Sequence, residues 1–266
     1  MNIADSVIVV TGAGSGIGAE LARRFVAEGA THVMLADRNL AAAQAVAEGL
    51  GEQATAVELD VTDEAAIGQL VTEVLQRHGR IDLFCSNAGV ALGVGIDGPT
   101  ELWQRAWDIH VMSHVYAARA VLPSMLERGQ GYLLNTASAA GLLSAPGDAP
   151  YSVTKHGAVA LAEWLAYQYR DRGIRVSVLC PMGVDTPLLM DGLRDGHAGA
   201  KAVAASSEVI GVSQVADAVL EALHEETFLV LPHPQVGKFW AGKAADPDRW
   251  LAGMAHLAAE AGTTAD

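Results

Sequence analysis

The stretch that decides the fold is Thr11-Gly12-Ala13-Gly14-Ser15-Gly16-Ile17-Gly18. The apolar run 7–10 before it is typical of a buried strand, and residues 17–27 after it have a helical pattern. Glycines let the chain turn sharply and approach a pyrophosphate, toward which the helix start presents unpaired N–H groups and a positive dipole. A simple tight turn is the alternative, but the strand before and the helix after favour a dinucleotide loop. Its candidate binding residues are Gly12, Ser15, Gly16, Ile17 and Gly18.

Outward from this loop, short apolar runs alternate with longer helical patterns. We expect further strands at 32–36, 55–59, 81–85, 132–136, 174–179 and 228–231. We expect further helices at 40–50, 64–77 (capped by Asp63), 102–127, 152–170 and 215–223. Continuous apolar strands separated by helices predict an α/β Rossmann fold, a doubly wound parallel sheet of about seven strands with helices on both faces. No linker divides the 266 residues, so we expect a single domain over 1–266.

Two stretches break the alternation after the expected catalytic helix. Residues 187–212 are rich in Gly, Ala and Ser, and the pattern leaves open whether they contain a helix. Residues 232–266 form a C-terminal tail that carries Trp240 and Trp250. Both are candidates for covering a substrate site, although a plain surface helix explains the tail about as well.

Composition excludes several functional classes. A net charge of −14 and a pI of about 4.9 argue against binding nucleic acid or an anionic membrane. No run approaches the roughly 18 apolar residues of a membrane span, and no signal peptide precedes the first apolar run. The two cysteines, Cys85 and Cys180, lack the spacing of a metal site and are expected to be reduced core thiols. We therefore expect a cytoplasmic protein without a metal.

Asp37 ends the second expected strand, 19 residues past Gly18. A carboxylate at this position can accept hydrogen bonds from both ribose hydroxyls of the adenosine and would repel a 2′-phosphate, which favours NAD over NADP. Arg38 follows directly and could instead pair with a 2′-phosphate. The alternative is that Asp37 only caps a helix, a role that requires no cofactor.

Three further residues suggest an acid/base centre. Tyr151 lies directly before the expected helix 152–170, and Lys155 lies in its first turn. A spacing of four residues at the start of a helix puts both side chains on one face. A free tyrosine has a pKa of about 10, which is too high for it to act as a base at neutral pH. A neighbouring ammonium and a cationic nicotinamide would both stabilise its phenolate. Ser138 follows a strand and so faces the crevice at the carboxyl edge of the sheet, where it could hold a substrate oxygen.

Together these features resemble the short-chain dehydrogenase/reductase family in its single-domain form, over residues 6–231. The resemblance rests on Thr11 to Gly18, Asp60-Val61, Asn87-Ala88-Gly89, Ser138, Tyr151, Lys155 and Pro181-Met182-Gly183-Val184-Asp185-Thr186. It implies that Asp60 and Val61 lie by the adenine, that Asn87, Ala88 and Gly89 support the sheet and cofactor, and that Pro181, Gly183, Val184 and Thr186 flank the nicotinamide carboxamide. It also implies a homo-oligomer, a tetramer or a dimer paired through the two long central helices.

Two residues depart from the family. His110 stands where the family usually has an Asn at a helix kink, whose backbone carbonyl holds a water in a proton relay to the lysine. His110 could join that relay, since imidazole titrates near neutrality, or it could only fill the kink. Met182 stands where Gly is common.

The expected function is hydride transfer between NAD(H) and a secondary alcohol or ketone. Tyr151 would act as acid/base, with Ser138, Lys155 and His110 beside it. Leu92, Leu142, Leu143, Leu188, Leu189 and Met190 lie in loops expected to line the substrate pocket, which favours an apolar substrate. The alternatives are an idle dinucleotide-binding sensor or scaffold of the same fold, and an enzyme using the same site for dehydration or epimerisation.

Overall fold

The run Val7–Thr11 is buried along its whole length and forms β1, near the middle of a seven-stranded parallel sheet. The computed structural model describes residues 1–262. The other strands are β2 (His32–Asp37), β3 (Ala54–Glu58), β4 (Leu83–Ser86), β5 (Gly131–Thr136), β6 (Ile174–Leu179) and β7 (Leu229–Val230). Their order is β3-β2-β1-β4-β5-β6-β7, so successive strands are added toward one edge of the sheet up to β3 and toward the other edge from β4 onward. Ligands bind at such a switch point in open α/β sheets.

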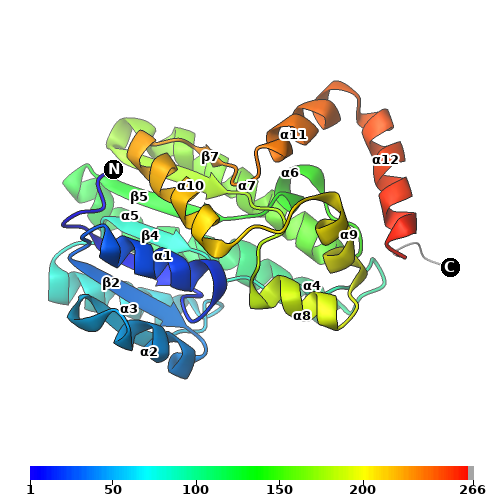
Figure 1. The fold of residues 1–266 in the computed structure, drawn as a ribbon. Helices are drawn as coiled ribbons and strands as arrows, with labels where there is room; N and C mark the ends of the chain where they lie inside the picture. Colours follow the sequence, from blue (N-terminus) through cyan, green and yellow to red (C-terminus); the bar gives the residue numbers. More distant parts are fainter. Residues whose placement is uncertain (263–266) are drawn as a thin grey trace.

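Helices cover both faces of the sheet, as Figure 1 shows. One face packs against α3 (Glu64–His78), α5 (Ser113–Arg128) and α7 (Ala149–Tyr169). The other face packs against α1 (Gly16–Ala27), α2 (Leu40–Glu48) and α10 (Val212–Glu225). Short 3-10 turns occur at Gly51–Gln53 and Arg170–Arg172. The predicted single-domain Rossmann fold is confirmed.

The helix expected at 102–127 is interrupted. It consists of α4 (Thr100–Trp107), a π-helical turn at Asp108–Met112, and α5. The wide turn contains His110, at the kink that the family resemblance implied. Ser113 donates a side-chain hydrogen bond of 2.6 Å to the carbonyl of Ile109, which helps to accommodate the irregular backbone.

Both stretches that break the strand–helix alternation are helical. Residues 187–212 contain α8 (Pro187–Arg194) and α9 (Ala198–Ser206), and the tail contains α11 (Gln235–Ala245) and α12 (Pro247–Glu260). The last four residues of the predicted tail, 263–266, lie outside the described residues. One short helix after β5, α6 (Ala140–Leu143), was not predicted from the sequence. In residues 1–262 no helix is both long enough and apolar enough to cross a membrane.

Candidate active site

A single cavity of about 1140 Å³ opens along the carboxyl ends of the strands and continues to α12. It brings together most of the predicted site residues: Gly12, Ser15, Gly16, Ile17, Asp37, Arg38, Asp60, Val61, Asn87, Ala88, Gly89, Ser138, Tyr151, Lys155, Pro181, Val184 and Thr186. Gly18, Gly183 and His110 lie behind this lining. Nowhere in residues 1–262 do three His, Cys, Asp or Glu side chains gather where they could hold a metal ion.

The glycine loop has the shape that a pyrophosphate needs. Gly12 has a φ of +66°, and a Cβ there would lie 2.8 Å from Cα of Ala88. A Cβ on Gly18 would lie 2.3 Å from the carbonyl oxygen of Gly12, so this position also requires glycine. Ser15, at the N-cap of α1, makes no side-chain hydrogen bond to the helix, which leaves the first-turn N–H groups facing the cavity for an anion. The residues present therefore fit a dinucleotide.

Asp37 lies at the end of β2 with both carboxylate oxygens held by backbone. Oδ2 accepts from the N–H of Gly14 at 2.8 Å, and Oδ1 accepts from the N–H of Asn39 at 2.8 Å. The neighbouring Arg38 is exposed at the same end of the cavity. Asp60 accepts hydrogen bonds from the backbone and side chain of Thr62, and these bonds hold the pKa of its carboxyl below the usual value. This end of the cavity carries carboxylates suited to ribose hydroxyls.

Asn87 joins the ends of three central strands. Its Nδ2 donates to the carbonyl of Thr11 at 3.1 Å, and its Oδ1 accepts from the hydroxyl of Thr136 at 3.2 Å. The Lys155 ammonium in turn donates to the carbonyl of Thr136 at 2.9 Å. Asn87 and Lys155 are thus both hydrogen-bonded to Thr136, the last residue of β5.

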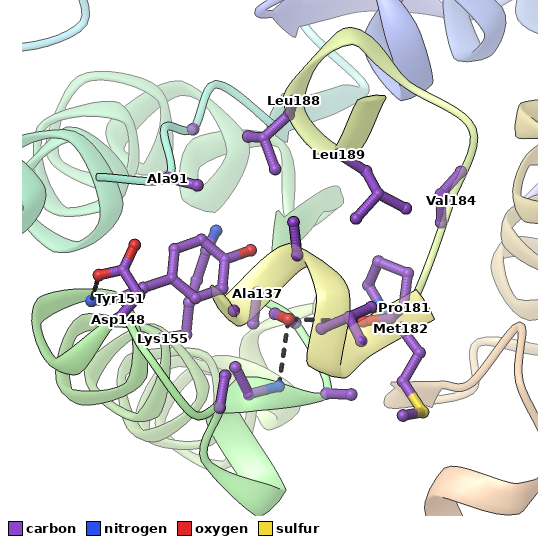
Figure 2. Close-up of a pocket in the computed structure, with 18 of the residues that line it drawn as sticks. Ala91, Ala137, Asp148, Tyr151, Lys155, Pro181, Met182, Val184, Leu188 and Leu189 are labelled. Atoms are coloured by element: carbon purple, nitrogen blue, oxygen red, sulfur yellow. Dashed lines mark hydrogen bonds between the residues drawn. The ribbon is translucent and has the colours of Figure 1, made fainter. Parts of the chain in front are cut away.

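Tyr151, Lys155 and Ser138 share one wall of the cavity. Figure 2 shows the phenol pointing into the open space with Lys155 beside its ring, and Lys155 Nζ lies 5.6 Å from the ring centroid. The Ser138 hydroxyl accepts from the N–H of Ala140 at 3.1 Å. Burial raises the pKa of Tyr151 to about 12, against a lowering contribution from the Ser138 hydroxyl. Burial also lowers the pKa of Lys155 to about 8.

His110 is fully buried behind Gly89, and both of its ring nitrogens have protein partners. Nε2 accepts from the N–H of Val90 at 3.1 Å, so Nδ1 carries the proton and donates to the hydroxyl of Thr154 at 2.8 Å. Burial, and then the nearby Lys155, lowers the pKa of His110 well below its usual value. The ring also stands edge-on to Tyr151, with centroids 5.4 Å apart. This geometry fits a neutral side chain that braces the site.

Two further residues, which were not predicted from the sequence, shape the site. Asp148 caps α7 by accepting from the N–H of Tyr151 at 3.0 Å, and its other oxygen accepts from the N–H groups of Leu92 and Gly93, both at 2.8 Å. His233 accepts from the N–H of Met182 at 3.2 Å and donates to the carbonyl of Gly183 at 3.1 Å. The Asp-Ala-Pro run before Tyr151 is a helix-start pattern that could have identified Asp148. No local pattern marks His233.

The chain also resembles proteins of known family. The family model for short chain dehydrogenases matches residues 6–195. A 1-deoxy-11-beta-hydroxypentalenate dehydrogenase from Streptomyces exfoliatus is 36% identical over 234 residues, which cover 86% of this chain and 83% of that protein. A meso-2,3-butanediol dehydrogenase from Serratia marcescens is 37% identical over 188 residues, which cover 70% of this chain and 74% of that protein.

Solved structures agree with these sequence relatives. A short chain dehydrogenase/reductase from Burkholderia phymatum, solved in complex with NAD, superposes with a TM-score of 0.85 at 28% identity and covers 93% of this chain and 96% of its own. A 3-ketoacyl-(acyl-carrier-protein) reductase from Brucella melitensis, complexed with NADH, gives a TM-score of 0.77 at 28% identity, covering 87% of this chain and 98% of its own.

Proposed function

The chain belongs to the short-chain dehydrogenase/reductase family, and from this membership we infer that it is an oxidoreductase that transfers hydride between NAD(H) and an apolar secondary alcohol or its ketone. One observation carries the proposal. Ser138, Tyr151 and Lys155 lie on one wall of a cavity whose other end is the glycine loop and Asp37. The names of two relatives, a hydroxypentalenate dehydrogenase and a butanediol dehydrogenase, support a hydroxylated substrate.

The proposed chemistry follows from the wall of the site. The bound dinucleotide supplies the hydride acceptor or donor, and its oxidised nicotinamide adds positive charge that favours a phenolate. In oxidation, Tyr151 Oη takes the hydroxyl proton of the alcohol while the Ser138 hydroxyl holds the same oxygen. In reduction, Tyr151 returns a proton to the carbonyl oxygen. Lys155 holds positive charge near the phenol and offers donors to a ribose.

NAD is the proposed cofactor because Asp37 is fixed by two backbone N–H groups at the ribose end. The test compares kcat/KM for NAD and NADP with one alcohol, in the parent protein and in Asp37→Ser. We expect the parent to prefer NAD and the variant to lose most of that preference. A parent that prefers NADP overturns the assignment and makes Arg38 the deciding residue.

The enzyme proposal is tested with a panel of secondary alcohols and NAD, followed at 340 nm. NADH production supports it, whereas tight NADH binding with no turnover of any alcohol or ketone favours the idle sensor or scaffold. A product of unchanged redox state would indicate dehydration or epimerisation instead. We also propose a homo-oligomer, a dimer or tetramer, while the predicted cytoplasmic location stays a prediction.

A further inference from the structure

The C-terminal helix α12 carries an apolar face that the rest of the protein covers only in part, since its residues are half-buried. Trp250, Met254 and Leu257 follow one another at spacings of four and three residues, so they lie on one side of the helix. All three line the cavity, yet α12 has no fully buried residue. An amphipathic helix normally buries such a face against the core. Here the face, which we name the α12 face, looks onto open cavity.

The α12 face is held in place by the helix before it. Val236 of α11 is fully buried, and Lys243 of α11 donates a hydrogen bond of 2.6 Å to the carbonyl of Leu142 in α6. The ring centroids of Phe239 and Trp250 lie 6.3 Å apart, which packs α12 onto α11. Figure 1 shows α11 leading away from the sheet and α12 turning back beside α9, which it contacts. The cavity therefore has a fixed apolar wall on this side.

The wall that meets Tyr151 from the other side is apolar as well. Leu188 and Leu189 of α8 lie across the open space from the phenol in Figure 2, and Val203 of α9 also lines the cavity. Three exposed carboxylates stand among the lining residues at this end, Asp191, Asp195 and Asp246. Asp191 is paired with Arg194, which leaves two carboxylates against the guanidinium of Arg249. This excess of negative charge disfavours an anionic substrate.

We propose that the α12 face binds the apolar body of a bulky, uncharged secondary alcohol or ketone, while its oxygen reaches Ser138 and Tyr151. The inference rests on the proposed hydride transfer and adds the substrate class. A small alcohol would occupy only the space beside Tyr151 and leave the α12 face against water. A bulky apolar substrate, for which 2-decalone serves as the probe, removes that surface from water, which favours its binding.

The test uses 2-decalone and acetone as ketones, with NADH, on the full-length protein. Met254→Ser places a hydroxyl in the α12 face, and Leu251→Ser is the matched control, because Leu251 is on the same helix, 61% exposed, and absent from the cavity lining. We expect the parent to prefer 2-decalone. We expect Met254→Ser to lower the ratio of kcat/KM for 2-decalone to that for acetone at least tenfold, and Leu251→Ser to leave the ratio unchanged.

Three results would overturn the inference: an unchanged ratio in Met254→Ser, tighter binding of a carboxylated decalone than of 2-decalone, or a change in subunit assembly instead of substrate preference. Failure of the proposed function is recognised separately. If no ketone is turned over, calorimetric titration of the NADH complex with 2-decalone still reports on the α12 face. Binding that weakens in Met254→Ser and persists in Leu251→Ser supports the apolar site without hydride transfer, and no binding to the parent refutes it.

Discussion

In its proposed role, a charged Lys155 stabilises the phenolate of Tyr151 at the expense of the stability of the folded state. Burial lowers its pKa to about 8, from about 10.5 in the unfolded chain. Keeping it charged at pH 7 therefore costs up to about 3 kcal/mol. Lys155→Met keeps most of the side-chain volume and loses the bond to Thr136, so we expect a net gain of about 1–2 kcal/mol in the free energy of unfolding at pH 7, with turnover lost.

The sign of this effect gives a pH test for Lys155→Met. Between pH 8 and 10.5 the unfolded chain holds the lysine proton that the folded protein has lost, so parental stability rises with pH across this window. The advantage of the methionine variant should shrink over the same range in urea unfolding curves. A variant that is less stable than the parent at pH 7 would show that Lys155 is not destabilising.

Tyr151→Phe removes the proposed acid/base and keeps the ring packed against His110. We expect kcat to fall by about 10²–10⁴-fold while the Kd for NADH, measured by fluorescence, stays within about twofold of the parent. In the parent, oxidation should accelerate as pH rises, because it requires the phenolate and burial favours the phenol. Near-parental kcat in the variant would exclude Tyr151 from this role.

His110 is proposed to act as a positioning residue. Its ring should remain neutral across the neutral range because burial lowers its pKa, so no His110 titration should appear in the pH–rate profile. His110→Asn cannot bridge Val90 and Thr154 as the longer ring does, and we expect a lower kcat/KM with an unshifted profile. His110→Leu, which loses both bonds, should be worse. A parental pKa near neutrality that disappears in His110→Asn would instead assign the ring to proton relay.

At the scale of elements, Asp148 couples the start of α7 to the loop 90–94. Asn has one acceptor oxygen in place of two, so Asp148→Asn releases either the cap of α7 or the N–H groups of Leu92 and Gly93. We expect the KM for the alcohol to rise and kcat to fall about tenfold, with NADH binding retained.

The control for Asp148→Asn is Asp63→Asn. Asp63 caps α3 in the same manner, accepting from the N–H groups of Ala65 and Ala66, and is not itself a lining residue, although the neighbouring Asp60 and Val61 are. Each variant should lose no more than about 1 kcal/mol of stability, measured by urea unfolding, and only Asp148→Asn should change the kinetics. Equal kinetic effects in both variants would attribute them to general loosening.

The elements could be predicted from the sequence where local patterns decide them. Short runs rich in apolar residues identified all seven strands, and Asp63 was recognised as a cap because capping depends on neighbouring residues alone. The π-helical turn at Asp108–Met112 lies within the continuous helical pattern 102–127. Only the family resemblance indicated a kink at His110. The two bonds of His233 depend on tertiary contacts across some fifty positions, which no local pattern contains.

At the scale of the whole molecule, buried histidines contribute to the response to acid. His114 is buried in α5, neither ring nitrogen has a hydrogen-bond partner within residues 1–262, and burial lowers its pKa to about 3. Between pH 6.5 and 3 the unfolded chain binds a proton at this residue that the folded protein does not, so stability falls as pH falls. His114→Leu should therefore flatten the fall in Tm on acidification.

The matched control for His114→Leu is His224→Gln, because His224 is exposed on α10. It should leave the acid dependence of Tm unchanged. Parallel Tm curves for the parent and His114→Leu between pH 6.5 and 4 would contradict this account of acid sensitivity.

The single continuous cavity has a consequence for the order of events in turnover. Asp37, Arg38 and Asp60 line the cavity at one end, and the α12 face lines it at the other. A bound dinucleotide would therefore form part of the surface on which the substrate rests. In its absence the substrate compartment lacks one side, so a sequential mechanism follows in which the dinucleotide arrives first and departs last. Product inhibition by the ketone should then be noncompetitive with NAD, whereas NADH should compete with it.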